Sequence, residues 1–134
     1  MKYLLDTDTC IALLRGHPEA VAEAQTCVPD DLAISSITRY ELKFGATRCA
    51  PRRRKTEAAK VESFLNALHE IPFSDQTAEH AARIRGELES AGQPIGPMDL
   101  LIAATAMEAG LKLVTGNQKE FGRIKHLRLE NWIY

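Results

Sequence analysis

The sequence lacks any apolar run long enough to cross a membrane. Its most apolar uncharged stretch, Leu100 to Met107, is far shorter than the ~20 residues that a bilayer-spanning helix needs. A secretory signal peptide is also missing, because Asp6 and Asp8 fall where such a peptide needs its apolar stretch. These absences predict a cytoplasmic protein without contact with a membrane.

The sequence also has few cysteines and almost no net charge. The 3 cysteines are odd in number and show no C-x-x-C spacing, so the sequence predicts reduced thiols rather than a disulfide framework or a zinc site. Lys and Arg number 17 against 18 Asp and Glu, which leaves a net charge of −1. This balance excludes a basic field over the whole protein, so any nucleic-acid site must rest on local patches.

What the sequence does contain is typical of a globular protein: 45% hydrophobic and 26% charged residues over 134 positions. No internal repeat, low-complexity tract or linker divides it, so we expect a single domain over residues 1–134. Short apolar runs alternate with longer segments of helical periodicity. This alternation predicts an α/β fold, a three-layer α/β/α sandwich around a parallel sheet of four to five strands.

The individual elements follow from the apolar runs and from the Pro and Gly residues between them. Predicted strands lie at residues 3–5, 32–35, 71–73, 111–115 and 127–129. The strand at 71–73 is the weakest, because Pro72 cannot donate to a ladder. Predicted helices lie at residues 9–14, 37–45, 56–68, 75–92 and 98–109, with a further one opened by Pro18. The helix at 98–109 is almost wholly apolar and is expected to be buried on most sides.

Acidic side chains fall where the predicted strands end. Asp6 ends the first strand, and Glu41 lies just inside the helix after the second. Asp99 opens the apolar helix, and Glu120 follows the strand that ends at Thr115. Ligands of parallel α/β sheets bind beyond the carboxyl ends of the strands. We therefore expect these four carboxylates to meet at one edge of the sheet.

Each acid also has a purely structural interpretation. Asp99 can cap its helix, Glu120 can lie on a solvated helix face, and Glu41 can pair with a cation of its own helix. Asp6 is harder to explain in this way, because an acid directly after a buried strand is costly unless it is paired or binds a metal. Clustered carboxylates repel one another and favour a cation among them. Ligands made only of oxygen are typical of Mg²⁺ or Mn²⁺.

Four blocks of the sequence resemble the signature blocks of PIN-domain ribonucleases. They read LLDTD from Leu4, ISSITRYELKFGA from Ile34, PIGPMDLLIA from Pro94 and VTGNQKEF from Val114. The blocks occur in the expected order and spacing over essentially the whole chain. Together they are most similar to the VapC-type toxins of bacterial type II toxin–antitoxin systems.

The resemblance implies a PIN-like α/β/α fold and a metal-dependent endoribonuclease. Asp6, Glu41 and Asp99 match the three core acids of the family, and Glu120 matches the fourth. The resemblance assigns all four to catalysis and to binding of Mg²⁺ or Mn²⁺. It leaves open whether Asn117 or Glu120 supplies the fourth ligand, since some relatives place an acid at the position of Asn117. The supporting polar residues are Asp8, Ser36, Thr115 and Asn117.

The substrate and partners are also implied by the resemblance. It implies hydrolysis of phosphodiester bonds in a structured RNA such as a tRNA, by a metal-activated water. It further implies a cognate VapB-type antitoxin that holds the enzyme inactive. The expected assembly is a homodimer, a higher assembly with the antitoxin, and operator DNA bound only through the antitoxin.

A basic segment, residues 48–55, follows the second signature block. As an RNA site, it would follow the phosphate backbone at the rim of the carboxylate edge without choosing a sequence. Its alternative is the solvated start of a helix. No aromatic residue lies in the segment, so it predicts no base-stacking platform there. Its cations are Arg48, Arg52, Arg53, Arg54 and Lys55.

Two other functions stay open on the sequence alone. The opening LLDTDT fits the D-x-D-x-T motif of haloacid-dehalogenase-type phosphatases, in which Asp6 would be the nucleophile, but no acid pair follows Thr115. The second alternative is a non-catalytic RNA- or partner-binding module whose acids hold a structural ion. The histidines lie outside the signature blocks, which predicts surface or structural roles for His17, His69, His80 and His126.

Overall fold

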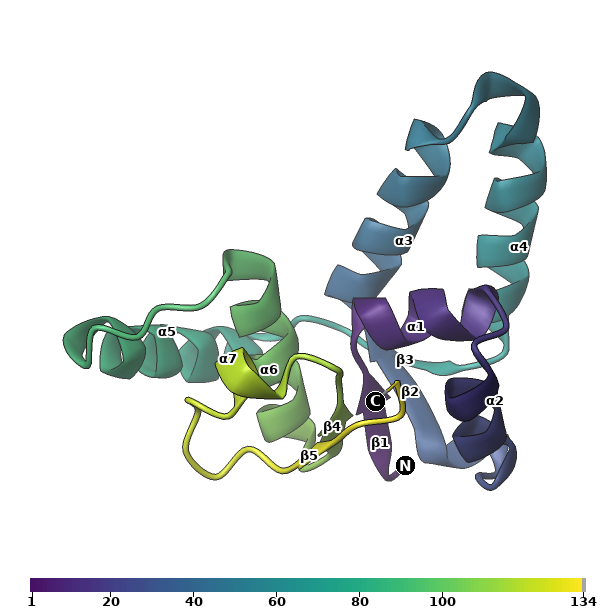
Figure 1. Cartoon of the computed structure of the whole chain (residues 1–134). Helices are drawn as coiled ribbons and strands as arrows, with labels where there is room; N and C mark the ends of the chain where they lie inside the picture. The colour runs from purple at the N-terminus through teal and green to yellow at the C-terminus, as the bar shows by residue number, and fades with distance from the viewer. Residues whose placement is uncertain (134) are drawn as a thin grey trace.

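A single parallel sheet forms the centre of the molecule (Figure 1). The structure is a computed structural model and describes residues 1–133. Within these residues, five strands lie in the order β3-β2-β1-β4-β5, and every neighbouring pair is parallel. In chain order they are β1 (Tyr3–Leu5), β2 (Leu32–Ser35), β3 (His69–Ile71), β4 (Lys112–Val114) and β5 (Leu129–Glu130).

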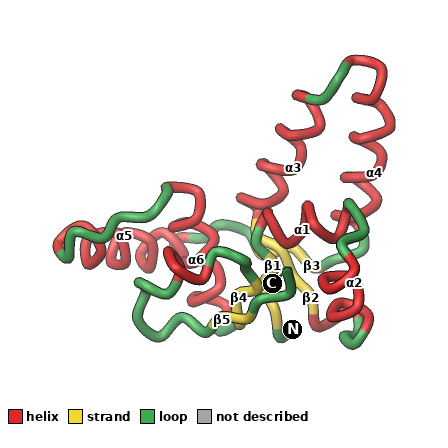
Figure 2. Tube along the Cα trace, viewed as in Figure 1, coloured by secondary structure: helices red, strands yellow, loops and turns green. Residues whose placement is uncertain are grey.

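Helices cover both faces of the sheet, which confirms the predicted three-layer α/β/α architecture (Figure 2). One face carries α1 (Thr7–Leu14), α2 (Pro18–Gln25), α3 (Ser36–Arg48) and α4 (Arg54–Asn66). The other face carries α5 (Asp75–Ser90), α6 (Pro97–Ala109) and the short α7 (Gln118–Phe121). The single-turn 3₁₀ helices η1 (Pro29–Asp31) and η2 (Pro51–Arg53) lie in the connections.

Buried strand residues alternate between two hydrophobic cores. Leu4 and Leu113 pack with α5 and α6, whereas Leu5 and Val114 pack with α1 to α4. This alternation follows from strand geometry, since successive side chains point to opposite faces of a sheet. The central strands are short but buried on both faces, and this fixes the position of the residues that follow them.

The helix α6 is buried on most sides, as its apolar sequence predicts. Its residues from Ile102 to Ala106 are at most 1% exposed. Pro97 begins the helix where a missing N–H has no consequence, and Gly110 ends it in the left-handed conformation with φ of 68°. No helix in the described part of the chain has the length and apolar character to cross a membrane, and α6 is a core helix.

The helices α3 and α4 form an antiparallel hairpin that extends beyond the sheet (Figure 1). We call this unit the α3–α4 hairpin. Near its base, Leu42, Val61 and Leu65 are buried in the same core as Cys10 of α1. Its distal turn, which contains η2, is exposed. The base of the hairpin is thus fixed by the core, while its far end is free to contact other molecules.

Several boundaries differ from the sequence-based prediction. The third strand lies at His69–Ile71 rather than at 71–73, because Pro72 has no N–H for the ladder and the strand must end before it. The last strand lies at Leu129–Glu130 rather than at 127–129, and α4 begins at Arg54 rather than near residue 56. The helix α7 was not predicted, because one turn is too short to show a period.

Candidate active site

The carboxyl ends of β1 and β4 meet at the centre of the sheet. The chain adds β2 and β3 on one side of β1 and then places β4 on its other side, so the strand order reverses between β1 and β4. Such a reversal leaves a crevice beyond the strand ends, where α/β proteins bind ligands. Asp6 directly follows β1 and Thr115 directly follows β4. The Asp6 N–H donates to the Val114 carbonyl at 3.0 Å, which joins the two strand ends.

Asp6 is a buried acid held by the start of a helix. It is only 4% exposed, and its Oδ1 accepts a hydrogen bond from the Thr9 N–H at 2.8 Å, which caps α1. Burial raises the pKa of Asp6, while hydrogen bonds from Thr115 and Thr9 act in the opposite direction. The Thr9 N–H therefore fixes this carboxylate at the strand end.

Asp99 lies in the first turn of α6 and is half-buried. Burial, the larger cause, and the negative charges of other acids together raise its pKa to about 6. Those acids come from three separate elements and from the end of β1, so the fold brings them into one electrostatic field. In order of effect they are Asp6, Glu120, Glu41 and Asp8.

Glu41 is oriented by Thr7, whose hydroxyl also lies next to that of Thr38, and neither threonine was predicted to be a site residue. The Thr7 hydroxyl donates to Glu41 Oε1 at 2.5 Å, and the Thr7 and Thr38 hydroxyls lie 3.1 Å apart. Thr38 is fully buried, and its N–H donates to the side chain of Ser35 at the start of α3. The contact joins α1 to α3 across more than thirty positions of sequence, so no local spacing could reveal it.

Glu120 is oriented by Asn117, which begins α7. Asn117 Nδ2 donates to Glu120 Oε2 at 2.9 Å, while Asn117 Oδ1 accepts from the Glu120 N–H at 3.4 Å. The Thr115 hydroxyl in turn accepts from the Asn117 N–H at 3.0 Å. Both ends of the Asn117 amide are therefore engaged with Glu120. This geometry favours Glu120 as the fourth acid and Asn117 as the residue that positions it.

The other predicted polar residues lie less centrally. Asp8 is exposed in the first turn of α1, but its charge reaches both Asp6 and Asp99. The Ser36 hydroxyl donates to Glu70 at 3.3 Å, on the side of α3 that faces β3. The described histidines pair with acids elsewhere on the surface or stand in turns, and the cysteines are free thiols. The histidine pairs are His17–Glu19, His69–Asp30 and His80–Glu108.

Carboxylate oxygens are the ligands that this edge of the sheet offers to a cation. Among residues 1–133, no three His, Cys, Asp or Glu side chains converge closely enough to form a ready metal site. Asp6, Glu41 and Glu120 each direct an oxygen to a hydrogen-bond donor of the chain instead. The donor set still fits a hard dication, because it contains only oxygen and because carboxylate repulsion contributes to the raised pKa of Asp99.

Comparison with known proteins assigns the family. A family model of the PIN domain matches residues 3–127. The chain belongs to the PIN domain family. It is 41% identical over 133 residues to the tRNA(fMet)-specific endonuclease VapC of Salmonella typhimurium, with 98% of each chain covered. It is 37% identical over 134 residues to Ribonuclease VapC2 of Rickettsia felis, again with 98% of each covered.

Solved structures agree with this assignment. The PIN domain superposes on DNA-bound VapBC from Salmonella typhimurium with a TM-score of 0.92 at 39% identity, covering 98% of each chain. It superposes on VapBC2 from Rickettsia felis, bound to a DNA fragment from its promoter, with a TM-score of 0.90 at 36% identity. That match covers 98% of this chain and 99% of the other. The relatives named as nucleases share its full length, so this PIN domain is a nuclease.

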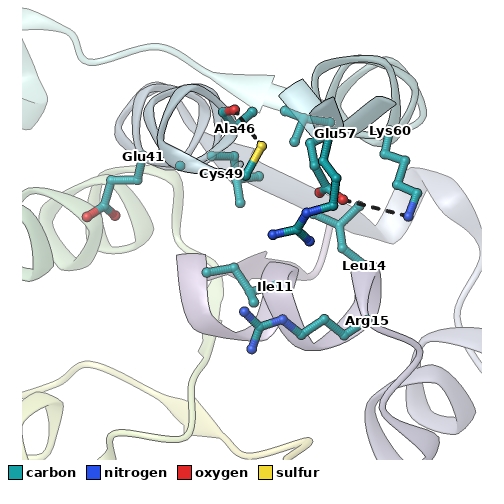
Figure 3. Close-up of a pocket in the computed structure, with 12 residues that line it drawn as sticks. Ile11, Leu14, Arg15, Glu41, Ala46, Cys49, Glu57 and Lys60 are labelled. Carbon is teal, nitrogen blue, oxygen red and sulfur yellow. Dashed lines mark hydrogen bonds and ion pairs between the residues drawn. The ribbon is translucent and has the colours of Figure 1, made fainter. Parts of the chain in front are cut away.

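A cleft of about 520 Å³ separates α1 of the PIN domain from the α3–α4 hairpin (Figure 3). Ile11 and Leu14 of α1 give it an apolar floor, and Arg15 adds a cation. Glu41 lies at one end, and its carboxylate points away from the other labelled side chains (Figure 3). The cleft therefore reaches as far as one of the four acids.

The basic segment does not form one patch on the PIN domain. All five of its cations are exposed, and three of them, Arg48, Arg53 and Arg54, lie on different parts of the α3–α4 hairpin. Arg53 lines the cleft, whereas Arg54 lines a separate groove with Lys43. The Arg48 guanidinium lies 5.5 Å from the centre of the Phe44 ring. The segment thus offers cations to several surfaces rather than one phosphate track.

Proposed function

We propose that the chain, as a single domain over residues 1–134, is a metal-dependent endoribonuclease that acts in the cytoplasm as the toxin of a toxin–antitoxin pair. The observation that carries the proposal is the shared negative field around Asp99 at the switch point of the sheet. Oxygen donors grouped at such a point are what a phosphodiester-cleaving dication needs. Relatives named endonuclease and ribonuclease, similar over their full length, support the same conclusion.

In this proposal Asp6 and Asp99 hold the principal cation, and Glu41 shares it. Glu120 holds a second ion or its water. Bound there, Mg²⁺ or Mn²⁺ supplies the acidity that activates the attacking water and the charge that stabilises the phosphate oxygens. No side-chain nucleophile is required, which agrees with the absence of any described histidine from this edge.

The surrounding polar groups orient the acids. The Thr7 hydroxyl restrains Glu41, and the Asn117 amide restrains Glu120, so that each carboxylate is held before substrate arrives. With a pKa of about 6, Asp99 is ionised at neutral pH but takes up a proton in mild acid. Protons and cations therefore compete for the same carboxylate, and the Mg²⁺ concentration at half-maximal cleavage should rise below about pH 6.

The substrate class follows from the relatives, two of which are named tRNA(fMet)-specific endonucleases. The test uses purified protein with purified initiator tRNA, in Mg²⁺, in Mn²⁺ and in EDTA. We expect cleavage in both metals and none in EDTA. Asp6→Asn and Asp99→Asn should be inactive, whereas Asp30→Asn, on an exposed residue at the opposite edge of the sheet, should cleave like the parent.

Other outcomes identify other functions. Full cleavage in EDTA would overturn the metal-dependent mechanism. Binding of RNA with no cleavage in any metal would point to the non-catalytic module. Inhibition by beryllofluoride, which mimics an aspartyl phosphate, together with phosphatase activity, would point to the haloacid-dehalogenase-type enzyme. The family match to the PIN domain supports the nuclease over both alternatives.

A cognate antitoxin is the proposed partner, because similar chains occur in structures of VapBC complexes. We expect a homodimer of this chain, a larger assembly with a VapB-type antitoxin, and operator DNA bound only through that antitoxin. The cleft beside α1 offers a place for an antitoxin segment, since its apolar floor ends at Glu41, where an arginine could pair with the acids. Such an antitoxin is expected to be the product of a small gene next to that of the chain. Co-expression of the two proteins should yield a complex and restore growth. Failure of both would overturn the toxin assignment.

A further inference from the structure

Two aromatic rings and an arginine form an exposed stripe on α3. Tyr40 is 58% exposed and Phe44 is 49% exposed, although both are large side chains that the core could have buried. Their rings are nearly parallel, with centroids 6.3 Å apart and an interplanar angle of 10°. The Arg48 guanidinium lies 5.5 Å from the centroid of the Phe44 ring. We call Tyr40, Phe44 and Arg48 the aromatic stripe.

The stripe lies on the helix that carries Glu41. Residues three and four positions apart share a face of a helix, so Tyr40, Phe44 and Arg48 run along one side of α3. Ile37, one turn earlier, packs against the core that contains α5 and α6. The side of α3 that carries Ile37 therefore faces α6, the helix that contains Asp99. Above this contact the same side continues as Phe44 and Arg48, which lie about 4.5 Å and about 10 Å beyond Glu41 along the helix axis.

The chemistry of the stripe suits unpaired nucleic-acid bases. Aromatic rings and arginine planes both stack on bases, and each such contact is tolerant of sequence because every base has a π face. Arg48 also supplies a cation at the far end of the stripe, where it can contact a backbone phosphate next to a stacked base. A purely apolar partner surface would gain nothing from Arg48.

We infer that the aromatic stripe stacks unpaired bases of the RNA substrate beside the bond that is cut. The inference rests on the proposed function and specifies its substrate as RNA that is single-stranded next to the cleavage site. Stacking there would hold the flanking nucleotides against α3, while the acids at the foot of the same helix engage the phosphate. The stripe residues are positioning residues, because they act on bases rather than on the reacting atoms.

The test uses an RNA hairpin with a seven-nucleotide loop that contains 2-aminopurine, whose fluorescence falls when the base stacks. The protein carries Asp6→Asn so that the RNA stays intact. We expect saturating parent protein to quench the probe. Tyr40→Ala and Phe44→Ala should each weaken binding about tenfold and reduce the quenching at saturation, the order expected for the loss of one stacked base.

Matched variants separate stacking from other effects. Phe44→Trp should preserve affinity and quenching, whereas Phe44→Leu, which keeps apolar bulk without a π face, should not. Phe73→Ala removes an exposed aromatic ring outside the stripe and should change neither. Arg53→Gln should weaken binding but leave the quenching at saturation unchanged, because Arg53 lies in the cleft and not on the stripe. Apart from the Asp6→Asn change that every protein in the comparison shares, the mutated side chains are exposed, so the variants should fold, and their Tm values check this.

The outcomes distinguish this inference from the proposed function. If the parent cleaves RNA, and Tyr40→Ala and Phe44→Ala bind RNA and quench the probe as the parent does, the aromatic stripe has no stacking role. The proposed nuclease function then stands. No binding or cleavage of any RNA would overturn the proposed function itself. If light scattering showed that Phe44→Ala converts a dimer into a monomer and quenching persisted, the stripe would be an interface between copies of the chain, which would also overturn the inference.

Discussion

The carboxylate edge and the α3–α4 hairpin are built in contrasting ways. At the edge, Asp6 is 4% exposed and every acid with a named role accepts a hydrogen bond or lies in the field of its neighbours. On the hairpin, cations and aromatic rings are exposed, and Tyr40, Phe44 and Arg48 contact one another on the surface of α3. The edge can fix reacting atoms, whereas the hairpin can adapt to a partner. This contrast predicts that rate depends on the edge and affinity on the hairpin.

The largest expected effect comes from the edge. Asp6→Asn or Asp99→Asn should lower the rate of RNA cleavage by at least ~10³-fold, because each removes a charge from the ligands of a catalytic cation. Single-turnover cleavage at saturating RNA measures this rate. RNA affinity, measured separately by fluorescence anisotropy, should change little. A large loss of affinity with an unchanged rate would reverse the comparison between the two regions.

A smaller effect is expected from the threonine behind Glu41. Thr7→Val keeps the shape of the side chain but removes the hydroxyl that donates to Glu41, so Mg²⁺ affinity should fall by roughly 10–100-fold. The readout is the Mg²⁺ concentration at half-maximal cleavage. Thr7→Ser restores the hydroxyl and should recover most of the affinity. If Thr7→Val and Thr7→Ser titrate alike, the hydrogen bond has no positioning role.

The hairpin prediction concerns affinity and salt. Replacing Arg52, Arg53, Arg54 and Lys55 by Gln should weaken binding of any RNA, and each phosphate that is no longer bound should flatten the slope of log affinity against log salt by roughly 0.7–0.9. Cleavage at saturating RNA should stay near the parent rate, because these interactions are equal in ground and transition states. The control replaces Arg83 and Arg85, exposed on α5, by Gln. Equal slopes for both variants would make the segment ordinary surface.

The smallest effect is on the stability of the metal-free protein. The pKa of Asp99 is raised from 3.8 to about 6 in the folded chain, so the folded state binds more protons between these values. The resulting stabilisation is fully present below about pH 3.8 and is lost as the pH rises through about 6. Asp99→Asn mimics the neutral acid and should raise the Tm in EDTA at pH 7.5, with the difference vanishing toward pH 4. A lower Tm at pH 7.5 would contradict this.

Local patterns predicted most of the fold because they act over short distances. Leu4 and Leu5 mark a strand buried on both faces, and the position of an acid just after it is readable without any structure. Pro72 weakened the predicted strand at 71–73, and the same missing N–H determines where β3 ends. The strand therefore lies two residues earlier than predicted.

Features that depend on distant contacts could not be predicted. Thr7 and Thr38 meet only because α1 and α3 pack together, and the direction of each arginine in the basic segment depends on the turn of the hairpin. The segment alone contains no aromatic residue, so it indicated no stacking surface. The fold places Arg48 over Phe44, which lies just outside the segment. This pair is local, but the predicted helix ended at residue 45, whereas α3 continues to Arg48 and brings both side chains onto one face.

The central position of β1 has a consequence for how the protein is made. Its partner β4 lies more than a hundred residues later, and Asp99 and Glu120 lie on either side of that late strand. A chain still on the ribosome, with β4 inside the exit tunnel, has a central strand that can pair with β2 but not with β4, and only part of its acid cluster. Synthesis itself therefore delays assembly of the acid cluster, because the four acids can meet only after β4 and Glu120 have left the tunnel.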